Sequence, residues 1–258
     1  MYKPSHSIVT TAVPDLRLLL QGAPGTGKTT FACKFPNPFI VDFDHKAPAG
    51  IDSVPFWNDD FLSAMQKVKG NVQPKHDVLY FWLKNELPKF EREQTVIIDS
   101  WTMIQNEIEI AVRQEPEHAG NKFHLHARRA EISRAICGLI KRAKCQIIVT
   151  CHEVEIWKQG EATGKLRPLQ TGQFGAEIAG HFTDYWRTHV DPVDRDVATG
   201  NPKKTADSKI SRLRGYYCQL IADDECECIT NPVLGEKARA KSIYYMPSTY
   251  EAYKGMYE

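Results

Sequence analysis

The chain has 258 residues, which allows one large domain or one domain with an appendage. Its 42% hydrophobic and 25% charged residues are typical of a globular protein that buries a substantial core. The formal net charge of +1 predicts no broad basic surface, so nucleic acid would have to bind at a local patch or an oligomeric groove. No apolar run approaches membrane-spanning length, no secretory signal is evident, and the seven scattered cysteines favour a reducing compartment. We therefore expect a cytoplasmic protein.

The N-terminal part is dominated by one motif and its flanking elements. Residues 1–13 are polar and β-prone, which favours a lead-in strand or arm. A buried-strand pattern follows at Leu16–Leu20, and a short helix at Thr29–Phe35 is stopped by Pro36. Between them lies Gly22–Thr30, GAPGTGKTT, which fits the phosphate-binding loop G-x-x-x-x-G-K-[ST] in the strand-to-helix context that this loop requires.

This P-loop predicts how a nucleoside triphosphate such as ATP is held. Glycines let the backbone curl so that its N–H groups point at phosphate oxygens, and the helix N-terminus adds partial positive charge. Lys28 is expected to reach the β- and γ-phosphates, and the Thr29 hydroxyl to ligate Mg²⁺. The predicted nucleotide-binding residues are Gly22, Ala23, Pro24, Gly25, Thr26, Gly27, Lys28, Thr29 and Thr30. The alternative is a chance glycine-rich turn.

The rest of the chain alternates between strand and helix patterns. Strands are predicted at Phe39–Asp44, Thr95–Asp99, Gln146–Thr150 and Tyr185–Val190, and helices at about 60–69, 76–92, 101–115 and 127–144. Loops are predicted at 45–59 and, because glycines are frequent and periodicity is weak, at 153–180. Near the C-terminus, a β-hairpin is predicted from Ser211–Ile221 and Glu225–Thr230, with an edge strand at Lys241–Met246.

Strands that alternate with helices predict an α/β fold, a mostly parallel sheet flanked by helices. We expect a single domain over residues 1–258, with its core at about 14–190 and a β-rich C-terminal extension at about 191–258. Ligands of such sheets bind at the carboxyl ends of the strands. The P-loop, the two acids Asp42 and Asp44, Asp99 and His152 all fall at those ends.

Acids at two strand ends are candidates for metal binding and for water activation. Asp99 ends an apolar strand, as a Walker B acid does, and is expected to organise Mg²⁺ with Thr29, although it or Ser100 could instead cap the next helix. No acid follows Asp99 directly, so the group that orients the attacking water is expected at the end of the second strand. Only one of Asp42 and Asp44 is expected to face the γ-phosphate easily, and we prefer Asp44.

His152 follows the fourth strand, where a polar side chain can contact the γ-phosphate and report its loss to the following loop. A capping or core histidine is the alternative. The candidate catalytic residues are therefore Lys28, Asp44, Asp99 and His152, with Thr29 and Asp99 as candidate metal ligands.

The order of these motifs resembles the RecA-type recombinase core: the P-loop, then VDFDHK, then TVIIDSW, then IIVTCHE before a glycine-rich loop. The chain is most similar to the short bacteriophage RecA-core ATPases of the Sak-four type, which work with single-strand annealing proteins, and GKLRPLQTGQFGAEIAGHFTDYWR resembles the corresponding part of those proteins. The resemblance covers about residues 14–190, with a weaker echo near 230–246. It implies a RecA-like, Mg²⁺-dependent ATP hydrolase that binds single-stranded DNA in phage recombination, annealing or replication.

The same resemblance implies an oligomer, a ring or filament, in the host bacterial cytoplasm, with a possible annealing or single-strand binding protein as partner. Asp44 stands where RecA-type proteins carry the catalytic glutamate, and is shorter by one methylene. His152 stands where they carry a γ-phosphate-sensing glutamine, and imidazole can donate the same hydrogen bond. Lys237 and Arg239, with Lys241 nearby, resemble basic residues that reach a neighbouring subunit's γ-phosphate, although a solvated basic turn is the alternative.

The segment at about 154–177 corresponds to the DNA-binding loop of that family. Its DNA-contact candidates are Trp157, Lys158, Lys165, Arg167 and Phe174. Three basic and four acidic residues between Glu153 and Glu177 do not by themselves make an electrostatic groove, so backbone amides, stacking aromatics and neighbouring subunits would have to contribute.

Two other functions stay open. A small-molecule P-loop kinase needs a basic lid, for which Arg128, Arg129 and Arg134 are conceivable. A nucleotide-gated loader or regulator with slow hydrolysis is compatible with the short Asp44 and the near-neutral charge. No N-K-x-D base-reading motif appears, which disfavours a GTPase.

Overall fold

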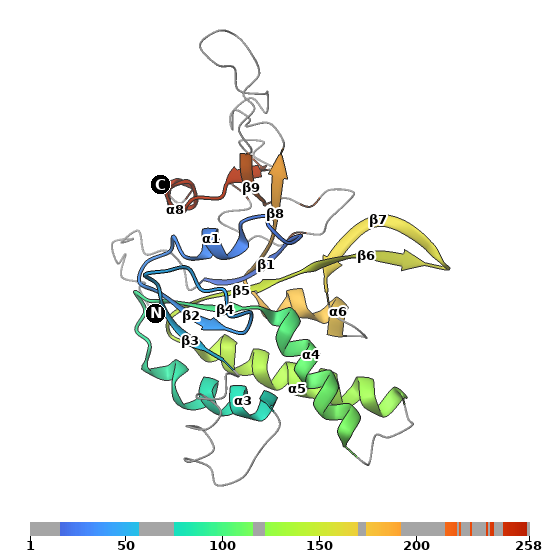
Figure 1. Cartoon of the computed structure of the whole chain (residues 1–258). Coiled ribbons are helices and arrows are strands. Elements are labelled where there is room, and N and C mark those ends of the chain that lie inside the picture. Colours follow the sequence, from blue (N-terminus) through green and yellow to red (C-terminus); the bar gives the residue numbers. More distant parts are fainter. Residues whose placement is uncertain are drawn as a thin grey trace, which may run out of the picture.

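The computed structural model describes residues 16–56, 75–115, 122–169, 174–191, 215–220, 222, 228, 236, 238–239 and 245–256. Within these residues an eight-stranded sheet lies between two layers of helices, and a two-stranded hairpin projects from it (Figure 1).

The sheet has the strand order β10-β9-β8-β1-β5-β4-β2-β3. Its strands are β1 (Arg17–Gln21), β2 (Pro38–Asp42), β3 (Asp52–Pro55), β4 (Thr95–Asp99), β5 (Gln146–Cys151), β8 (Asp184–Asp191), β9 (Gly215–Gln219) and β10 (Tyr245–Pro247). All pairings from β8 to β3 are parallel, whereas β9 and β10 are antiparallel additions at one edge. The predicted, mostly parallel α/β sheet is therefore confirmed.

Helices cover both faces of the sheet, because side chains alternate along each buried strand. The helical elements are α1 (Lys28–Ala32), α3 (Lys75–Asn85), η1 (Leu87–Lys89), α4 (Trp101–Gln114), α5 (Lys122–Arg142), α6 (Phe174–Glu177), η3 (Ile178–His181) and α8 (Tyr250–Gly255). Leu19 points to the core beneath α3, α4 and α5, whereas Leu18 and Leu20 point to the core beneath α1 and α8. Each face thus buries its own hydrophobic layer (Figure 1).

The prediction of a loop at 153–180 is wrong. The chain forms the antiparallel pair β6 (Glu153–Lys158) and β7 (Glu161–Pro168), followed by α6 and η3. Gln159 and Gly160 both have positive φ angles, 52° and 88°, as a two-residue hairpin turn requires. The glycines therefore mark a turn between strands. This hairpin pairs with itself rather than with the main sheet, so its half-exposed strands show little hydrophobic periodicity.

Other boundaries differ more modestly. The loop predicted at 45–59 contains the edge strand β3, and the predicted helix at 76–92 ends early and continues as η1 around Pro88. The predicted helix at 127–144 begins earlier, at Lys122. The predicted helix at 60–69 lies outside the described residues, as does the strand predicted at 225–230 apart from Cys228.

The C-terminal strands extend the main sheet. β9 pairs with β8 on one side and with β10 on the other. On the α1 face of the sheet, Tyr253 of α8 packs against Phe35 and Trp186. The C-terminal extension and the P-loop helix α1 therefore pack in the same hydrophobic core.

Arg17 is a charged residue within the buried strand β1, with 6% of its surface exposed. Its guanidinium donates hydrogen bonds to the carbonyls of Ile140 (3.1 Å) and Cys145 (2.9 Å), and also to that of Ala143. Ile140 lies in the last turn of α5, where a helix leaves acceptors without intrahelical donors and favours positive charge, and Ala143 and Cys145 lie in the short connection to β5. Arg17 thus ties the P-loop strand to the end of α5.

We expect Arg17→Met to lower the free energy of unfolding by about 2–4 kcal/mol, because it leaves buried carbonyls without a charged donor. Urea denaturation followed by circular dichroism measures the change. Arg142→Met, at the exposed end of α5, is the matched control and should change stability by less than about 0.5 kcal/mol. Equal effects of the two substitutions would contradict a capping role for Arg17.

Candidate nucleotide-binding site

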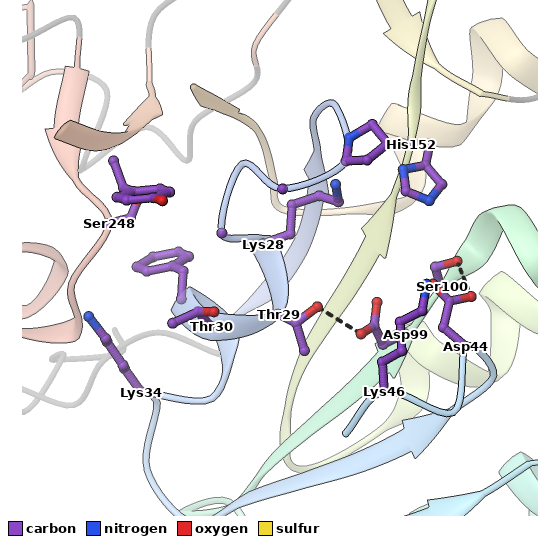
Figure 2. A pocket seen from close by; sticks show the side chains of 15 residues that line it. Lys28, Thr29, Thr30, Lys34, Asp44, Lys46, Asp99, Ser100, His152 and Ser248 are labelled. Atoms are coloured by element: carbon purple, nitrogen blue, oxygen red, sulfur yellow. Dashed lines mark hydrogen bonds between the residues drawn. The ribbon is translucent and has the colours of Figure 1, made fainter. Parts of the chain in front are cut away.

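The carboxyl ends of β1, β2, β4 and β5 meet at one edge of the sheet, and a pocket of about 650 Å³ opens there around the P-loop (Figure 2). This volume lies within the ordinary range of small-molecule sites. The pocket is lined by Pro24, Gly25, Gly27, Lys28, Thr29, Thr30, Phe31, Lys34, Asp44, Lys46, Asp99, Ser100, His152, Tyr216 and Ser248. The structure therefore brings together the P-loop and three of the four polar residues predicted at strand ends, with Asp42 buried just behind.

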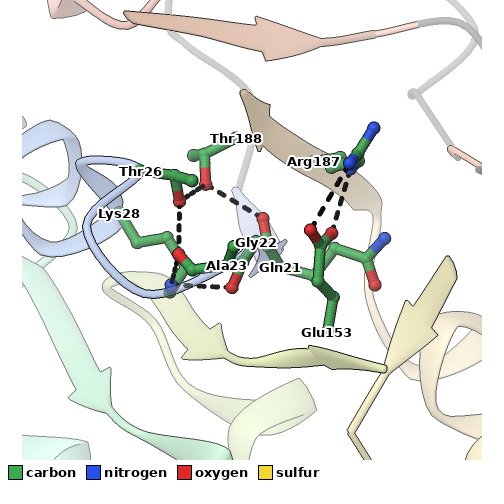
Figure 3. A network of polar contacts seen from close by, with 8 residues as sticks. All are labelled: Gln21, Gly22, Ala23, Thr26, Lys28, Glu153, Arg187 and Thr188. Atoms are coloured by element: carbon green, nitrogen blue, oxygen red, sulfur yellow. Dashed lines mark hydrogen bonds and ion pairs between the residues drawn. The ribbon is translucent and has the colours of Figure 1, made fainter. Parts of the chain in front are cut away.

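The P-loop is fixed by close contact with β8. A Cβ atom on Gly22 would lie 2.2 Å from Oγ1 of Thr188, so only glycine fits there. The Thr188 hydroxyl is 3.1 Å from the carbonyl of Gln21 and 2.6 Å from the Thr26 hydroxyl, which in turn donates to the Ala23 carbonyl at 2.8 Å (Figure 3). These bonds hold the loop's curve in place before any ligand arrives.

Lys28 lies inside this curve. Its Nζ donates to the carbonyls of Gly22 and Ala23, each at 2.9 Å (Figure 3). Burial lowers the pKa of Lys28, and the nearby Cys151 and Asp99 oppose that shift. The ammonium is thus held at the loop, where a phosphate could replace the carbonyls as its partner.

Asp99 is held between two hydroxyls. It accepts a hydrogen bond from Thr29 Oγ1 at 2.8 Å and another from Thr150 Oγ1, and only 5% of its surface is exposed. Burial raises the pKa of Asp99, and the two hydroxyl donors act in the opposite direction. The carboxylate and the Thr29 hydroxyl are hard oxygen ligands on adjacent elements, which fits Mg²⁺.

The ligand count also fits a shared metal site. Among the described residues, no group of three or more His, Cys, Asp or Glu side chains could hold a metal ion alone. Mg²⁺ characteristically binds through one or two carboxylates and completes its octahedron with phosphate oxygens and water. Thr29 and Asp99 could therefore hold Mg²⁺ together with a nucleotide.

Ser100 occupies the N-cap position of α4, but its side chain makes no capping hydrogen bond there. The Asp99–Ser100 peptide bond is cis. Ser100 Oγ lies 3.5 Å from Asp44 Oδ1, a long contact across the pocket. Neither the Asp99 nor the Ser100 side chain therefore caps α4, in contrast to the helix-cap alternative.

Asp42 and Asp44 have different environments. Asp42 is buried, and its carboxylate accepts hydrogen bonds from the backbone N–H groups of Asp44 (3.1 Å) and Ala47 (2.8 Å). It therefore shapes the turn after β2. Asp44 is half-buried and lines the pocket beside Ser100 and Lys46 (Figure 2). This geometry favours Asp44 over Asp42 as the acid that meets a terminal phosphate.

His152 and Ser248 lie on opposite walls of the pocket (Figure 2). Its backbone N–H donates to Thr102 Oγ1 at 2.9 Å, and its Nδ1 is buried without a hydrogen-bond partner among the described residues. Burial lowers the pKa of His152, and the positive charge of Lys28 lowers it further, while Asp44 and Asp99 oppose both. The imidazole is therefore neutral near pH 7.

The β6–β7 hairpin begins directly at His152. The carbonyl of His152 accepts from the Leu169 N–H at 2.7 Å, and Glu153 forms an ion pair with Arg187 of β8 at 2.9 Å (Figure 3). Both side chains of this pair are nearly buried, 9% and 12% exposed. The base of the hairpin is thus anchored both to the pocket wall and to the strand that pins the P-loop.

The predicted DNA-contact residues lie in different environments. Trp157 is 63% exposed near the hairpin turn, Lys158 and Lys165 are exposed, and Arg167 is half-buried. Phe174 is only 1% exposed and packs in the core near Trp101. The prediction that Phe174 stacks on DNA is therefore wrong for this structure, because its ring is covered by protein.

The predicted trans-acting basic residues are only partly described. Arg239 is exposed beside Ala238, which is fully buried in the core beneath α1 and α8. Lys237 and Lys241 lie outside the described residues.

Sequence reasoning missed several groups of the site. Thr150 stands two residues before His152 in the same motif, so its hydrogen bond to Asp99 could have been anticipated from the parallel pairing of β4 and β5. Thr188 on β8, Tyr216 on β9 and Ser248 just after β10 are distant in sequence, and no local signal marks them. Lys46 ends the VDFDHK motif and lines the pocket.

None of the helices in the described part of the chain is both long enough and apolar enough to cross a membrane.

No curated protein matches the chain. Among solved structures, the crystal structure of the RadB recombinase is 12% identical (78% of this chain, 86% of that chain, TM-score 0.33). The KaiC-like protein PH0186 from the hyperthermophilic archaeon Pyrococcus horikoshii OT3 is 15% identical (84% and 90%, TM-score 0.35).

The family comparison covers most of the chain. Residues 15–212 match AAA_24, a family described as an AAA domain, and the matched range includes the P-loop, Asp44, Asp99 and His152. In the strand order, β5 lies between the P-loop strand β1 and β4, the strand that Asp99 ends. The chain belongs to this AAA-domain family of P-loop proteins.

Proposed function

We propose that this protein is a Mg²⁺-dependent, RecA-type ATPase that couples ATP hydrolysis to binding of single-stranded DNA. One observation carries the proposal: Lys28, Thr29, Asp44, Asp99 and His152 line one pocket of about 650 Å³ around the P-loop. Together they supply a phosphate cradle, two metal ligands, a carboxylate and a neutral imidazole. Those are the groups that phosphoryl transfer to water requires.

Each group has a distinct chemical role in this proposal. Mg²⁺, when bound, neutralises charge that develops on the phosphate oxygens. Lys28 exchanges its carbonyl partners for the β- and γ-phosphates, and Thr29 and Asp99 hold the metal. Asp44 accepts a hydrogen bond from the attacking water and orients it in line with the γ-phosphate.

We expect Asp44→Asn to slow steady-state ATP hydrolysis by about 10²–10⁴-fold while nucleotide affinity changes little, because the amide cannot take up the water's proton. Phosphate release and binding of a fluorescent ATP analogue measure the two effects. Lys28→Ala is the comparison variant and should lose binding as well as hydrolysis. Unchanged turnover in Asp44→Asn would remove Asp44 from this role.

His152 is proposed to sense the γ-phosphate. Its ring faces the pocket while its carbonyl and the adjacent Glu153 anchor the hairpin, so a small shift of His152 reaches β6 directly. Gain or loss of the γ-phosphate would thereby change how the hairpin is presented.

A pH dependence follows from the lowered pKa of His152. The ordinary pKa is 6.5, and the free protein's value lies below it, whereas a bound triphosphate favours the imidazolium and raises it. Binding therefore takes up protons at pH values between these two pKa values, so affinity rises as pH falls through this window and the gain is absent above it. Calorimetry in buffers of different ionisation enthalpy should show less proton uptake for His152→Gln than for the native protein. Equal uptake would contradict contact between His152 and phosphate.

The β6–β7 hairpin is the proposed DNA contact. Its charge is more favourable for binding DNA than the count of acidic and basic residues in the sequence indicates. Two of the four acids in this segment are neutralised elsewhere: Glu153 by Arg187, and Glu177 by Arg134 at 2.9 Å. Trp157 and Lys158 lie beside the hairpin turn, where Lys158 is opposite Glu161, and Lys165 lies in the middle of β7. The remaining acids of the segment are Glu155 and Glu161, against Lys158, Lys165 and Arg167. A stacking aromatic flanked by lysines suits sequence-independent binding of a single strand.

We expect Trp157→Ala to weaken binding of an oligo(dT) by about 5- to 100-fold, the range for loss of one base–aromatic stack. Fluorescence anisotropy in the presence of an ATP analogue measures the affinity. Tyr80→Ala, an exposed aromatic on α3, is the control and should have no effect. Lys158→Ala with Lys165→Ala should reduce the salt dependence of log K by about 1.4. An unchanged salt slope would argue against phosphate contacts there.

The finer identity of the protein is also part of this proposal. Similarity of its motifs to short phage RecA-core ATPases of the Sak-four type suggests a role in phage recombination, annealing or replication, in the host cytoplasm and beside an annealing or single-strand binding protein. We propose one domain over residues 1–258 that assembles as a ring or filament. Exposed Arg239, with Lys237, would then reach the nucleotide of a neighbouring subunit.

The two alternatives differ in what supports them. The kinase hypothesis needs a basic lid over the phosphates, but none of the three candidate arginines on α5 lines the pocket. Each of them is paired with an acid instead: Arg128 with Glu131, Arg129 with Glu109 and Arg134 with Glu177. The hypothesis of a loader that hydrolyses ATP slowly is still supported, because the Asp44 side chain is one methylene shorter than the catalytic glutamate of RecA-type proteins. ATP turnover with and without single-stranded DNA separates the loader from the ATPase.

A further inference from the structure

The pocket extends beyond the groups that would meet phosphates and metal. His152, Asp44 and Lys46 lie on one side of the P-loop, whereas Lys34, just after α1, and Ser248, after β10, lie on the other (Figure 2). The nucleotide proposed above needs both sides, because its base is separated from its γ-phosphate by the ribose and two further phosphates. The proposed metal ligand Asp99 and the water-orienting Asp44 lie on the first side, which therefore suits the γ-phosphate, so the base belongs on the other side.

An exposed aromatic lines that other side. Tyr216 of β9 is 45% exposed, whereas its chain neighbours Gly215 and Tyr217 are buried. A Cβ atom on Gly27 would lie 3.1 Å from Cδ1 and 3.6 Å from Cε1 of the Tyr216 ring. The ring therefore rests against the last glycine of the P-loop, and nearly half of the residue remains open in the pocket.

The sheet register explains how Tyr216 comes to lie there. Tyr216 and Cys218 share a face of β9, and Cys218 is buried in the core beneath α1 and α8. Tyr216 therefore points to the α1 side of the sheet, where the P-loop enters its helix. Tyr245, which pairs with Gln219, lies on the opposite face.

We propose that Tyr216 is the nucleobase platform of this pocket, with its ring stacked on the base of a nucleotide whose phosphates lie in the P-loop. This inference rests on the proposed nucleotide site and deepens it. Stacking uses the π-face that every base has, so Tyr216 distinguishes nucleotides from inorganic polyphosphates and contributes little to the choice between adenine and guanine. Apolar ring surface that is otherwise open to water becomes covered by the ligand.

The test compares three ligands, each as its Mg²⁺ complex: ATP, GTP and inorganic tripolyphosphate, titrated by calorimetry. The native protein should bind both nucleotides more tightly than tripolyphosphate. Tyr216→Ala should weaken ATP and GTP by similar factors, about 5- to 100-fold, and tripolyphosphate by less than about twofold. Tyr216→Phe should retain nucleotide affinity within about twofold.

Two controls separate stacking from support of the loop. Tyr216→Leu keeps an apolar contact on Gly27 but lacks a π-face, so it should behave as Tyr216→Ala does. Tyr245→Ala removes a comparably exposed tyrosine, 38% against 45%, from the other face of the same edge and should bind all three ligands as the native protein does.

Three results would overturn the inference. Equal weakening of all three ligands by Tyr216→Ala would mean that Tyr216 merely supports the P-loop. Full nucleotide affinity in Tyr216→Leu would exclude stacking. Equal affinity of the native protein for ATP and tripolyphosphate would show that no base site exists, while the phosphate site stands. Failure of the native protein to bind any of the three would instead refute the proposed nucleotide site itself.

Discussion

The whole site depends on one buried carboxylate. Asp99 ends β4, and its two oxygens are held by the hydroxyls of Thr29 at the start of α1 and Thr150 near the end of β5. A buried carboxylate is costly unless it is hydrogen-bonded, so this arrangement fixes the spacing of three elements at once. The Asp99 carboxylate and the Thr29 hydroxyl could also share a metal ion with a nucleotide. Structural and chemical requirements therefore coincide at Asp99.

From this point the pocket divides into two ends with different chemistry. Asp44 and His152 lie toward β2 and β5, whereas the Tyr216 ring, the Ser248 hydroxyl and Lys34 lie toward the other end. The P-loop runs between the two ends and is pinned to β8. A ligand with a polyanionic tail and a flat apolar head matches this polarity along its length.

The polar network behind the P-loop gives the hairpin a physical connection to the pocket. Glu153 follows His152 and pairs with Arg187, which is adjacent to Thr188 on β8. Because this pair is nearly buried, losing one partner would leave a charge uncompensated, and the pair resists being pulled apart. In the proposed function, a shift of His152 would therefore reach β6 through this anchored base of the hairpin.

Local sequence determined the P-loop, the buried strands and the placing of Asp44, Asp99 and His152 at strand ends, because glycine spacing and hydrophobic runs are local signals. It misjudged the β6–β7 hairpin, whose exposed strands carry little periodicity, and Phe174, whose burial depends on packing near Trp101. Only the tertiary structure decided that Arg17 caps α5, that Arg187 neutralises Glu153, and that Tyr216 rests on Gly27. Each of those contacts joins residues far apart in the chain, and the register of the sheet, which no short segment encodes, brings them together.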